Sequence, residues 1–109
     1  MGNYVKGDIV LVLFPFSDLS SAKKRPALVI TQLNRDDAIV CQITTNNVAD
    51  GYSIEIQNTD LEVGQLLKQS YIRPNRLFTV DTNIIEKTVG KLKASKMSTV
   101  ISKITEIIS

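Results

Sequence analysis

Three consecutive cations, Lys23, Lys24 and Arg25, stand directly before an apolar run that begins at Pro26. The residue before a proline is biased toward extended backbone, so Arg25 is expected on a strand and not in a helix. An arginine guanidinium is a planar fork whose donors match two phosphate oxygens at once. The pattern therefore predicts an anion site at the mouth of this strand, with phosphate as the commonest ligand. A solvated loop end would explain the same three residues.

A second polar cluster closes the apolar run of residues 37–44. Thr44, Thr45 and Asn46 stand there, and their hydroxyls and amide can donate hydrogen bonds to phosphate oxygens or to base edges. Threonine and asparagine also favour strand ends because they satisfy turns. The pattern alone leaves both interpretations open.

A third cluster combines an aromatic side chain with cations. Ser70, Tyr71 and Arg73 follow one another closely, and Arg76 comes soon after. Aromatic rings and guanidinium planes stack on unpaired bases. A core tyrosine and an ordinary surface arginine would account for Tyr71 and Arg73 equally well.

The composition excludes several kinds of chemistry. The chain has no histidine and a single cysteine, so imidazole acid–base catalysis and His-bearing zinc sites are excluded, and no cofactor is expected. Cys41 lies inside an apolar run and is predicted to be buried and inert. Asp18, in the loop 15–24, is a candidate carboxylate base, although turns are rich in aspartate. Asp8 is expected to accept local backbone hydrogen bonds at the start of the first strand.

Short strands must position these side chains. Apolar, β-branched runs separated by glycine, proline, asparagine and aspartate predict strands at 8–14, 26–32, 37–44, 52–57, 66–73, 76–80 and near 87–92. The alternation around Ile54 and Ile56 predicts that this strand shows one face to water. Short strands at this spacing favour a mainly β fold, a small, strongly bent antiparallel barrel.

The C-terminal segment has a helical period. Apolar residues recur three and four positions apart, which predicts one buried stripe with Ser95 as the N-cap. The stripe consists of Met97, Val100, Ile101, Ile104, Ile107 and Ile108. We expect this helix to cover the core, and a partner-binding helix is the alternative.

The bulk properties are those of one ordinary globular domain, residues 1–109. Hydrophobic residues make up 43% and charged residues 22% of the chain, and the net charge of +2 says little about partners. No apolar run approaches the roughly 20 residues of a membrane span, so a cytoplasmic protein without a membrane partner is expected.

Taken in order, these segments resemble the MazF/PemK family of toxins, in particular a PemK-like subgroup. The likeness covers nearly the whole chain, and its Gly-Asp and Arg-Pro pieces are fairly specific at this spacing. It is carried by Gly7-Asp8-Ile9-Val10, Phe14-Pro15-Phe16, Arg25-Pro26-Ala27-Leu28-Val29-Ile30, Ile43-Thr44-Thr45-Asn46 and residues 70–79.

The resemblance implies an SH3-like barrel with a C-terminal helix, usually a homodimer. It also implies a ribosome-independent endoribonuclease that cuts single-stranded RNA at short motifs and is neutralised by a cognate antitoxin. The family's catalytic arginine matches Arg25 and its catalytic threonine or serine matches Thr44. The candidate substrate-binding residues are Lys24, Thr45, Asn46, Ser17, Asp18, Lys68, Ser70, Tyr71 and Arg73.

Two departures from the family keep alternatives open. The loop at 17–22 replaces the Gly-Ser-Glu-Gln type sequence of better-known members, and Lys68 and Ser70 stand where some members have an acidic residue. The proton-transfer group and the cleavage motif therefore stay undefined. The same barrel occurs in gyrase-poisoning toxins of the CcdB type, so a protein-binding toxin and a degenerate RNA-binding member are the alternatives.

Overall fold

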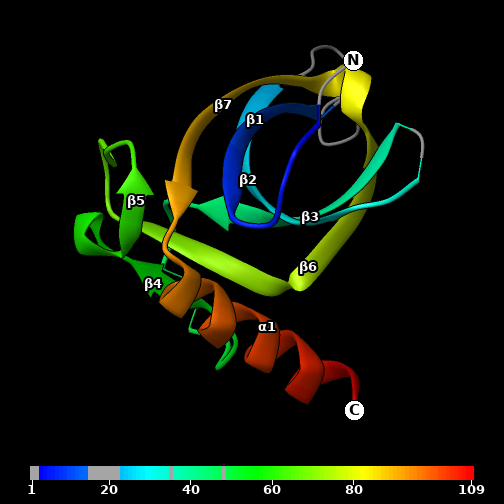
Figure 1. Ribbon diagram of the computed structural model, residues 1–109. Helices are drawn as coiled ribbons and strands as arrows, with labels where there is room; N and C mark the ends of the chain where they lie inside the picture. The colour runs from blue at the N-terminus through cyan, green and yellow to red at the C-terminus, as the bar shows by residue number, and fades with distance from the viewer. Residues whose placement is uncertain (1–2, 15–22, 35, 48) are drawn as a thin grey trace.

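The computed structural model describes residues 3–14, 23–34, 36–47 and 49–109 (Figure 1). The predictions for Ser17 and Asp18 lie outside the described residues. Within these ranges the chain forms an antiparallel sheet followed by a C-terminal helix, so the predicted mainly β class is confirmed.

The sheet is built from short segments, as the spacing of turn residues predicts. Its strands are β1 (Asp8–Phe14), β2 (Lys23–Gln32), β3 (Asp37–Thr44), β4 (Ile54–Ile56), β5 (Leu61–Val63), β6 (Ser70–Asp81) and β7 (Ile85–Leu92). The helix α1 is Ala94–Ile108, and single 3₁₀ turns at Asn58–Asp60 and Thr82–Ile84 precede β5 and β7. The predicted bounds of β1 and β3 agree with the structure.

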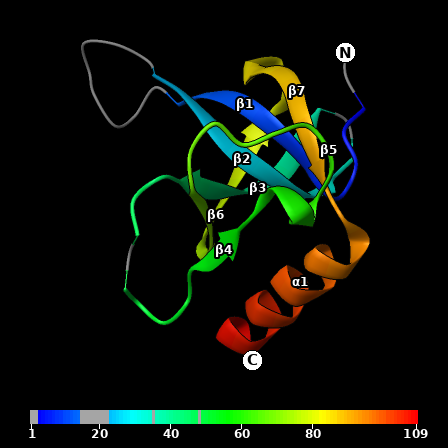
Figure 2. The ribbon, with the colours of Figure 1, turned by 90° about the vertical axis from the view of Figure 1, so that its left-hand side faces the viewer.

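The strands form a sheet with the order β4-β6-β3-β2-β1-β7-β5, in which every neighbouring pair is antiparallel. Figures 1 and 2 show that β1, β2, β3 and β7 curl around a common interior. In both views α1 lies outside this curl, beside β6. The predicted small, strongly bent antiparallel barrel with a C-terminal helix is therefore confirmed.

The sequence predicts two separate strands where the structure has the single long strand β6. The pairing of β6 with β3 jumps from Gln42 opposite Arg73 to Cys41 opposite Leu77, so the segment between them forms a bulge. Pro74, which is fully buried, lies in this bulge, the place where a strand tolerates a residue without an N–H. The strand bends there and continues.

Two apolar clusters fill the two sides of the curled sheet. The outer cluster lies between the sheet and α1 and contains Ile9, Leu28, Cys41, Ile43, Ile56, Leu61, Ile72, Leu92, Met97, Val100 and Ile104. The inner cluster lies inside the curl and contains Val10, Val12, Ala27, Val29, Val40, Val80 and Ile85. Cys41 is fully buried, so the prediction of a buried cysteine is confirmed, and burial raises the pKa of its thiol to about 12.

The helix covers the core, as predicted. Met97, Val100 and Ile104 are buried against the sheet, whereas Ile108 is 72% exposed, so its place in the predicted stripe is wrong. The N-cap is Lys93 and not Ser95. No helix in the described ranges is long and apolar enough to cross a membrane.

A tertiary contact explains the early start of α1. The backbone N–H of Lys93 donates to the Asp60 carbonyl oxygen at 2.8 Å, and the Lys96 ammonium lies 3.4 Å from the Asp60 carboxylate. These contacts fix the first turn of α1 on the segment before β5 and replace a side-chain cap. Asp8, which is paired with Lys91 at the end of β7, accepts a hydrogen bond from the Val5 N–H on its carboxylate at 3.0 Å, as predicted.

Candidate functional site

Arg25 lies within the paired strand β2 and not in a loop end. It is directly opposite Val12 of β1, and Val12 belongs to the inner cluster. Because directly paired residues share a face of the sheet, Arg25 lies on the inner face. The side chain is partly exposed, and within the described part of the chain nothing is hydrogen-bonded to its guanidinium. A stiff strand therefore presents donors that no other residue in the described ranges occupies.

Thr44 ends β3 on the same face of the sheet as Arg25. The pairing of β2 with β3 ends at Ala27 opposite Gln42, and continuing this register by two residues would place Arg25 opposite Thr44. Thr44 Oγ1 accepts a hydrogen bond from the Asn46 backbone N–H at 3.1 Å, so the predicted turn role is confirmed. A hydroxyl that accepts keeps its own proton. Thr44 can therefore donate to an anion while it holds the turn.

Tyr71 and Arg73 extend the inner face onto β6. Thr44 is paired with Tyr71, and Gln42 is paired with Arg73. Diagonal neighbours across an antiparallel pair lie about 7–8 Å apart. Thr44 therefore has an arginine on each side, Arg25 on β2 and Arg73 diagonally on β6. Tyr71 and Arg73 are both partly buried.

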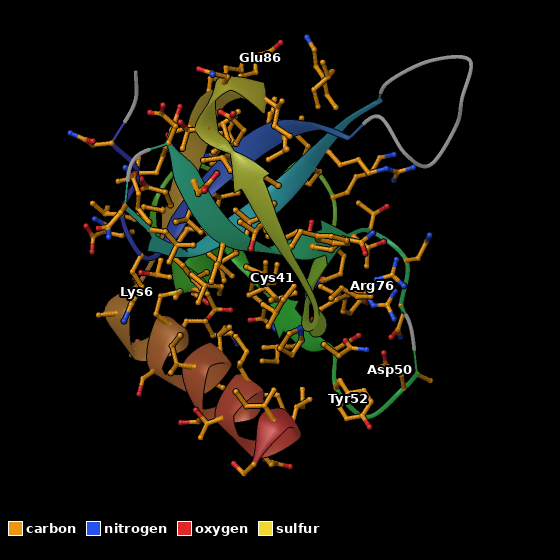
Figure 3. All side chains as sticks on the ribbon, turned by 90° about the vertical axis from the view of Figure 1, so that its right-hand side faces the viewer. Lys6, Cys41, Asp50, Tyr52, Arg76 and Glu86 are labelled. Atoms are coloured by element: carbon orange, nitrogen blue, oxygen red, sulfur yellow. The ribbon has the colours of Figure 1, made fainter. Side chains whose placement is uncertain are left out.

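A carboxylate already holds Arg73. Asp50 Oδ2 lies 3.2 Å from Arg73 Nη2, and only 20% and 18% of the two side chains are exposed. The other oxygen, Oδ1, accepts from the backbone N–H groups of Tyr52 and Ser53 at 2.9 and 3.1 Å. Figure 3 shows Asp50, Tyr52 and Arg76 on the same side of the molecule.

These contacts determine the charge of Asp50. The hydrogen bond from the Tyr52 N–H, with further ones from Ser53 and Arg73, lowers the pKa of Asp50 from 3.8 to about 2, and desolvation opposes the change. Asp50 is therefore ionised at neutral pH and is a weak proton acceptor.

The lowered pKa predicts a loss of stability in acid. A carboxyl group whose pKa is lower in the folded state contributes stability above its unfolded value of about 3.9 and loses it as the pH falls through the folded value. The difference in unfolding free energy between the wild type and Asp50→Ala should therefore shrink between about pH 5 and about pH 2. Urea unfolding followed by circular dichroism measures it. A difference that stays constant down to about pH 2 would contradict the ionised role of Asp50.

The structure does not bring two predicted residues to the inner face. Lys24 is next to Arg25 in the strand and therefore points the other way, where its ammonium lies 2.7 Å from Glu86. Ser70 is buried on the face opposite to Tyr71, and its hydroxyl donates to the Lys68 carbonyl oxygen at 3.1 Å.

Three other predicted residues lie at the end of the sheet where β3 stops and β6 begins. They are exposed, so a ligand that crosses the ends of these strands can reach them. They are Thr45, Asn46 and Lys68.

The sequence patterns do not single out three further polar residues near this face. Gln42 is directly opposite Arg73, and Glu55 of β4 is directly opposite Tyr71 and exposed. Asp50 is the third. Gln42 interrupts an apolar run and Asp50 begins an Asp-Gly turn, and both signals are weak by themselves. Glu55 joins the face only because β4 lies beside β6.

Residues 5–108 match the model of one protein family, described as the PemK-like, MazF-like toxin of type II toxin–antitoxin systems. The match includes the strand with Arg25 and the strand that ends at Thr44. No protein of curated function matches the sequence.

Several solved structures share the fold. An endoribonuclease in complex with its cognate antitoxin, from a Mycobacterial species, is 11% identical with a TM-score of 0.77 over 97% of this chain and 95% of that chain. A chain of the MazE–MazF structure (form III) from Deinococcus radiodurans is 14% identical, with a TM-score of 0.77 over 96% and 95%. The Mycobacterium tuberculosis toxin MazF-mt6 is 18% identical, with a TM-score of 0.73 over 93% and 95%. At these identities the likeness shows the fold alone.

Proposed function

We propose a function for this chain on the ground that it belongs to the PemK-like, MazF-like toxins of type II toxin–antitoxin systems. The chain is an endoribonuclease that cuts single-stranded RNA at short sequence motifs, in the cytoplasm, without the ribosome and without a metal. The observation that carries the proposal is the position of Thr44 on the inner face, with Arg25 on one side and Arg73 on the other. Two guanidinium groups and a hydroxyl donor match the oxygens of a phosphodiester.

RNA brings its own nucleophile to such a site. The 2′-hydroxyl attacks the adjacent phosphorus, the bond from phosphorus to the 5′-oxygen breaks, and the products are a 2′,3′-cyclic phosphate and a 5′-hydroxyl. The enzyme has to align the attack and stabilise the charge on the non-bridging oxygens. Arg25 supplies that positive charge, and the Thr44 hydroxyl donates a hydrogen bond to one oxygen.

Two protons must move during this reaction, one from the 2′-hydroxyl and one to the leaving 5′-oxygen. Asp18 or a network of hydroxyl groups accepts the first proton, and the same group or solvent water supplies the second. Asp50 does not suit this task, because its hydrogen bonds lower its pKa to about 2.

The rest of the inner face and its rim bind the substrate. Tyr71 offers a ring on which an unpaired base can stack, and Thr45, Asn46 and Lys68 are exposed where the RNA leaves the strand ends. The active species is a homodimer. A cognate antitoxin neutralises it with a disordered segment that covers the same inner face.

Cleavage of a long, weakly structured RNA by the purified chain in EDTA tests the function. The expected result is cutting at a repeated short motif, with cyclic-phosphate and 5′-hydroxyl ends found by end-group analysis. RNA binding should weaken with salt by roughly 0.7 log units per log unit of salt for each phosphate contact. Absence of cutting by the folded wild type would overturn the proposal and favour a toxin that binds a protein target.

The role of Thr44 predicts a difference between two substitutions. Thr44→Val removes a hydrogen bond to a charged group, which contributes about 1.5–3 kcal/mol, so the cleavage rate should fall about 10- to 150-fold. Thr44→Ser keeps the hydroxyl and should retain most of the activity. Single-turnover cleavage rates measure both. Equal losses in the two variants would show that the hydroxyl does not contact the phosphate.

A further inference from the structure

The contact between Asp50 and Arg73 bears on how this protein binds RNA. The two residues are 23 positions apart in the chain, and their ion pair joins the segment after β3 to the inner face of β6. Arg73 lies diagonal to Thr44, where its positive charge could bind an RNA phosphate. In this arrangement the Asp50 carboxylate neutralises that charge.

We propose that Asp50 competes with an RNA phosphate for Arg73 and that bound RNA displaces its carboxylate. This inference depends on the proposed function. A carboxylate and a phosphate both present oxygens to a guanidinium, and one guanidinium edge cannot serve both fully. Asp50 therefore lowers the affinity of the resting protein for RNA.

The two carboxylate oxygens of Asp50 have different partners, so RNA can displace Asp50 from Arg73 without disrupting the turn. Oδ1 accepts from the Tyr52 and Ser53 N–H groups, and the Ser53 hydroxyl donates to it as well at 3.3 Å. Oδ2 alone contacts Arg73. The turn is thus held by bonds that do not involve Arg73, so the ion pair can break while the turn survives.

Arg73 also has hydrogen-bonding capacity left. Its Nε is buried without a partner among the described residues, and so is Oε1 of Gln42, the residue directly opposite on β3. A donor and an acceptor that face each other across a strand pair can bond after a small rotation of either side chain. This bond would hold Arg73 once a phosphate takes the place of the Asp50 carboxylate.

The test measures binding of a short, random-sequence single-stranded RNA whose 2′-hydroxyls are methylated and which therefore cannot be cut. Asp50→Asn keeps an acceptor for the turn and removes the negative charge. Its Kd should be about fivefold lower than that of the wild type, the effect of losing one partly exposed ion pair. The plot of log Kd against log salt should steepen by about 0.7, because Arg73 gains a full phosphate contact.

Two controls separate competition from general charge. Asp81→Asn changes the net charge by the same amount as Asp50→Asn and also replaces a carboxylate that caps a turn. Asp81 lies at the opposite end of the part of β6 that pairs with β3. Its Kd should not change. In an Arg73→Gln background, Asp50→Asn should no longer raise the affinity. Amide hydrogen exchange at Tyr52 and Ser53 shows whether the turn is intact in each variant.

If Asp50→Asn binds RNA as tightly as the wild type or more weakly, the inference is overturned and the proposed function is unaffected. The same holds if Asp50→Asn still raises the affinity in the Arg73→Gln background. Failure of every variant, the wild type included, to bind the RNA would overturn the proposed function and this inference with it.

Discussion

Arg25→Ala is expected to slow RNA cleavage by at least about 100-fold. Arg25 is the one arginine of β2 and lies on the inner face opposite Val12, and the β2–β3 register continued beyond Ala27 and Gln42 would place it opposite Thr44. Removing one preorganised donor to the charge of a transition state costs about 2.7–4 kcal/mol, which corresponds to 100- to 1,000-fold in rate. Single-turnover cleavage of an RNA that contains the preferred motif is the measurement.

Two comparisons make the Arg25 prediction specific. Lys87→Ala removes one positive charge from an exposed position on β7 and should leave the rate unchanged. Arg25→Lys keeps the charge and loses the planar fork, so its rate should fall between those of the wild type and Arg25→Ala. A cleavage rate of Arg25→Ala within a few-fold of the wild type, with the fold intact by circular dichroism, would remove Arg25 from the mechanism.

Leu28→Ala is expected to have the second large effect, on stability. Leu28 lies in β2, is fully buried in the outer cluster and is paired with Ile9 of β1 and Cys41 of β3. Replacing a buried leucine by alanine costs about 2–5 kcal/mol, since transfer free energy is lost and a cavity remains. Because small domains are stable by only about 5–15 kcal/mol, the urea midpoint should fall markedly.

The matched control for Leu28→Ala is the same substitution at Leu67. This leucine is 98% exposed in the segment before β6, so Leu67→Ala should change the unfolding free energy by less than about 0.5 kcal/mol. Equal urea midpoints for the two variants would contradict the placement of Leu28 in the core.

The effect of Leu28→Ala bears on function as well. Leu28 anchors the middle of the strand whose first half carries Arg25. The inner-face geometry depends on this anchor, because an arginine on a loosely packed strand does not hold its guanidinium in place. We therefore expect the RNA cleavage rate of Leu28→Ala to fall below that of Leu67→Ala even where both are folded.

Local patterns were sufficient for the elements that bury their own side chains. The continuous apolar runs of β1 and β3 and the three-and-four spacing of Met97, Val100 and Ile104 report burial of the segment itself, so these elements were predicted correctly. Arg25 and Thr44 were identifiable for a similar reason, because each stands where an apolar run starts or stops. The family resemblance rests on the same local segments.

Two of the errors occur where a distant contact overrides local preference. The helix starts earlier than Ser95 predicts, because the contacts of Lys93 and Lys96 with Asp60 fix its first turn. The strand β5 has only three residues and no periodic pattern, and it is held by its pairing with β7. Neither contact can be predicted from the residue pattern of the segment itself.

Local sequence patterns are sufficient to predict a small β barrel with a covering helix and to identify Arg25 and Thr44 as candidate site residues. The neighbours of these two residues depend on how the strands pack together. The sheet order brings β6 beside β3, which places Arg73 near Thr44 and turns Ser70 away. The turn after β3 then brings the Asp50 carboxylate into an ion pair with Arg73. Spacing along a strand encodes which face a side chain takes, but the neighbouring strand is chosen by packing of the whole core.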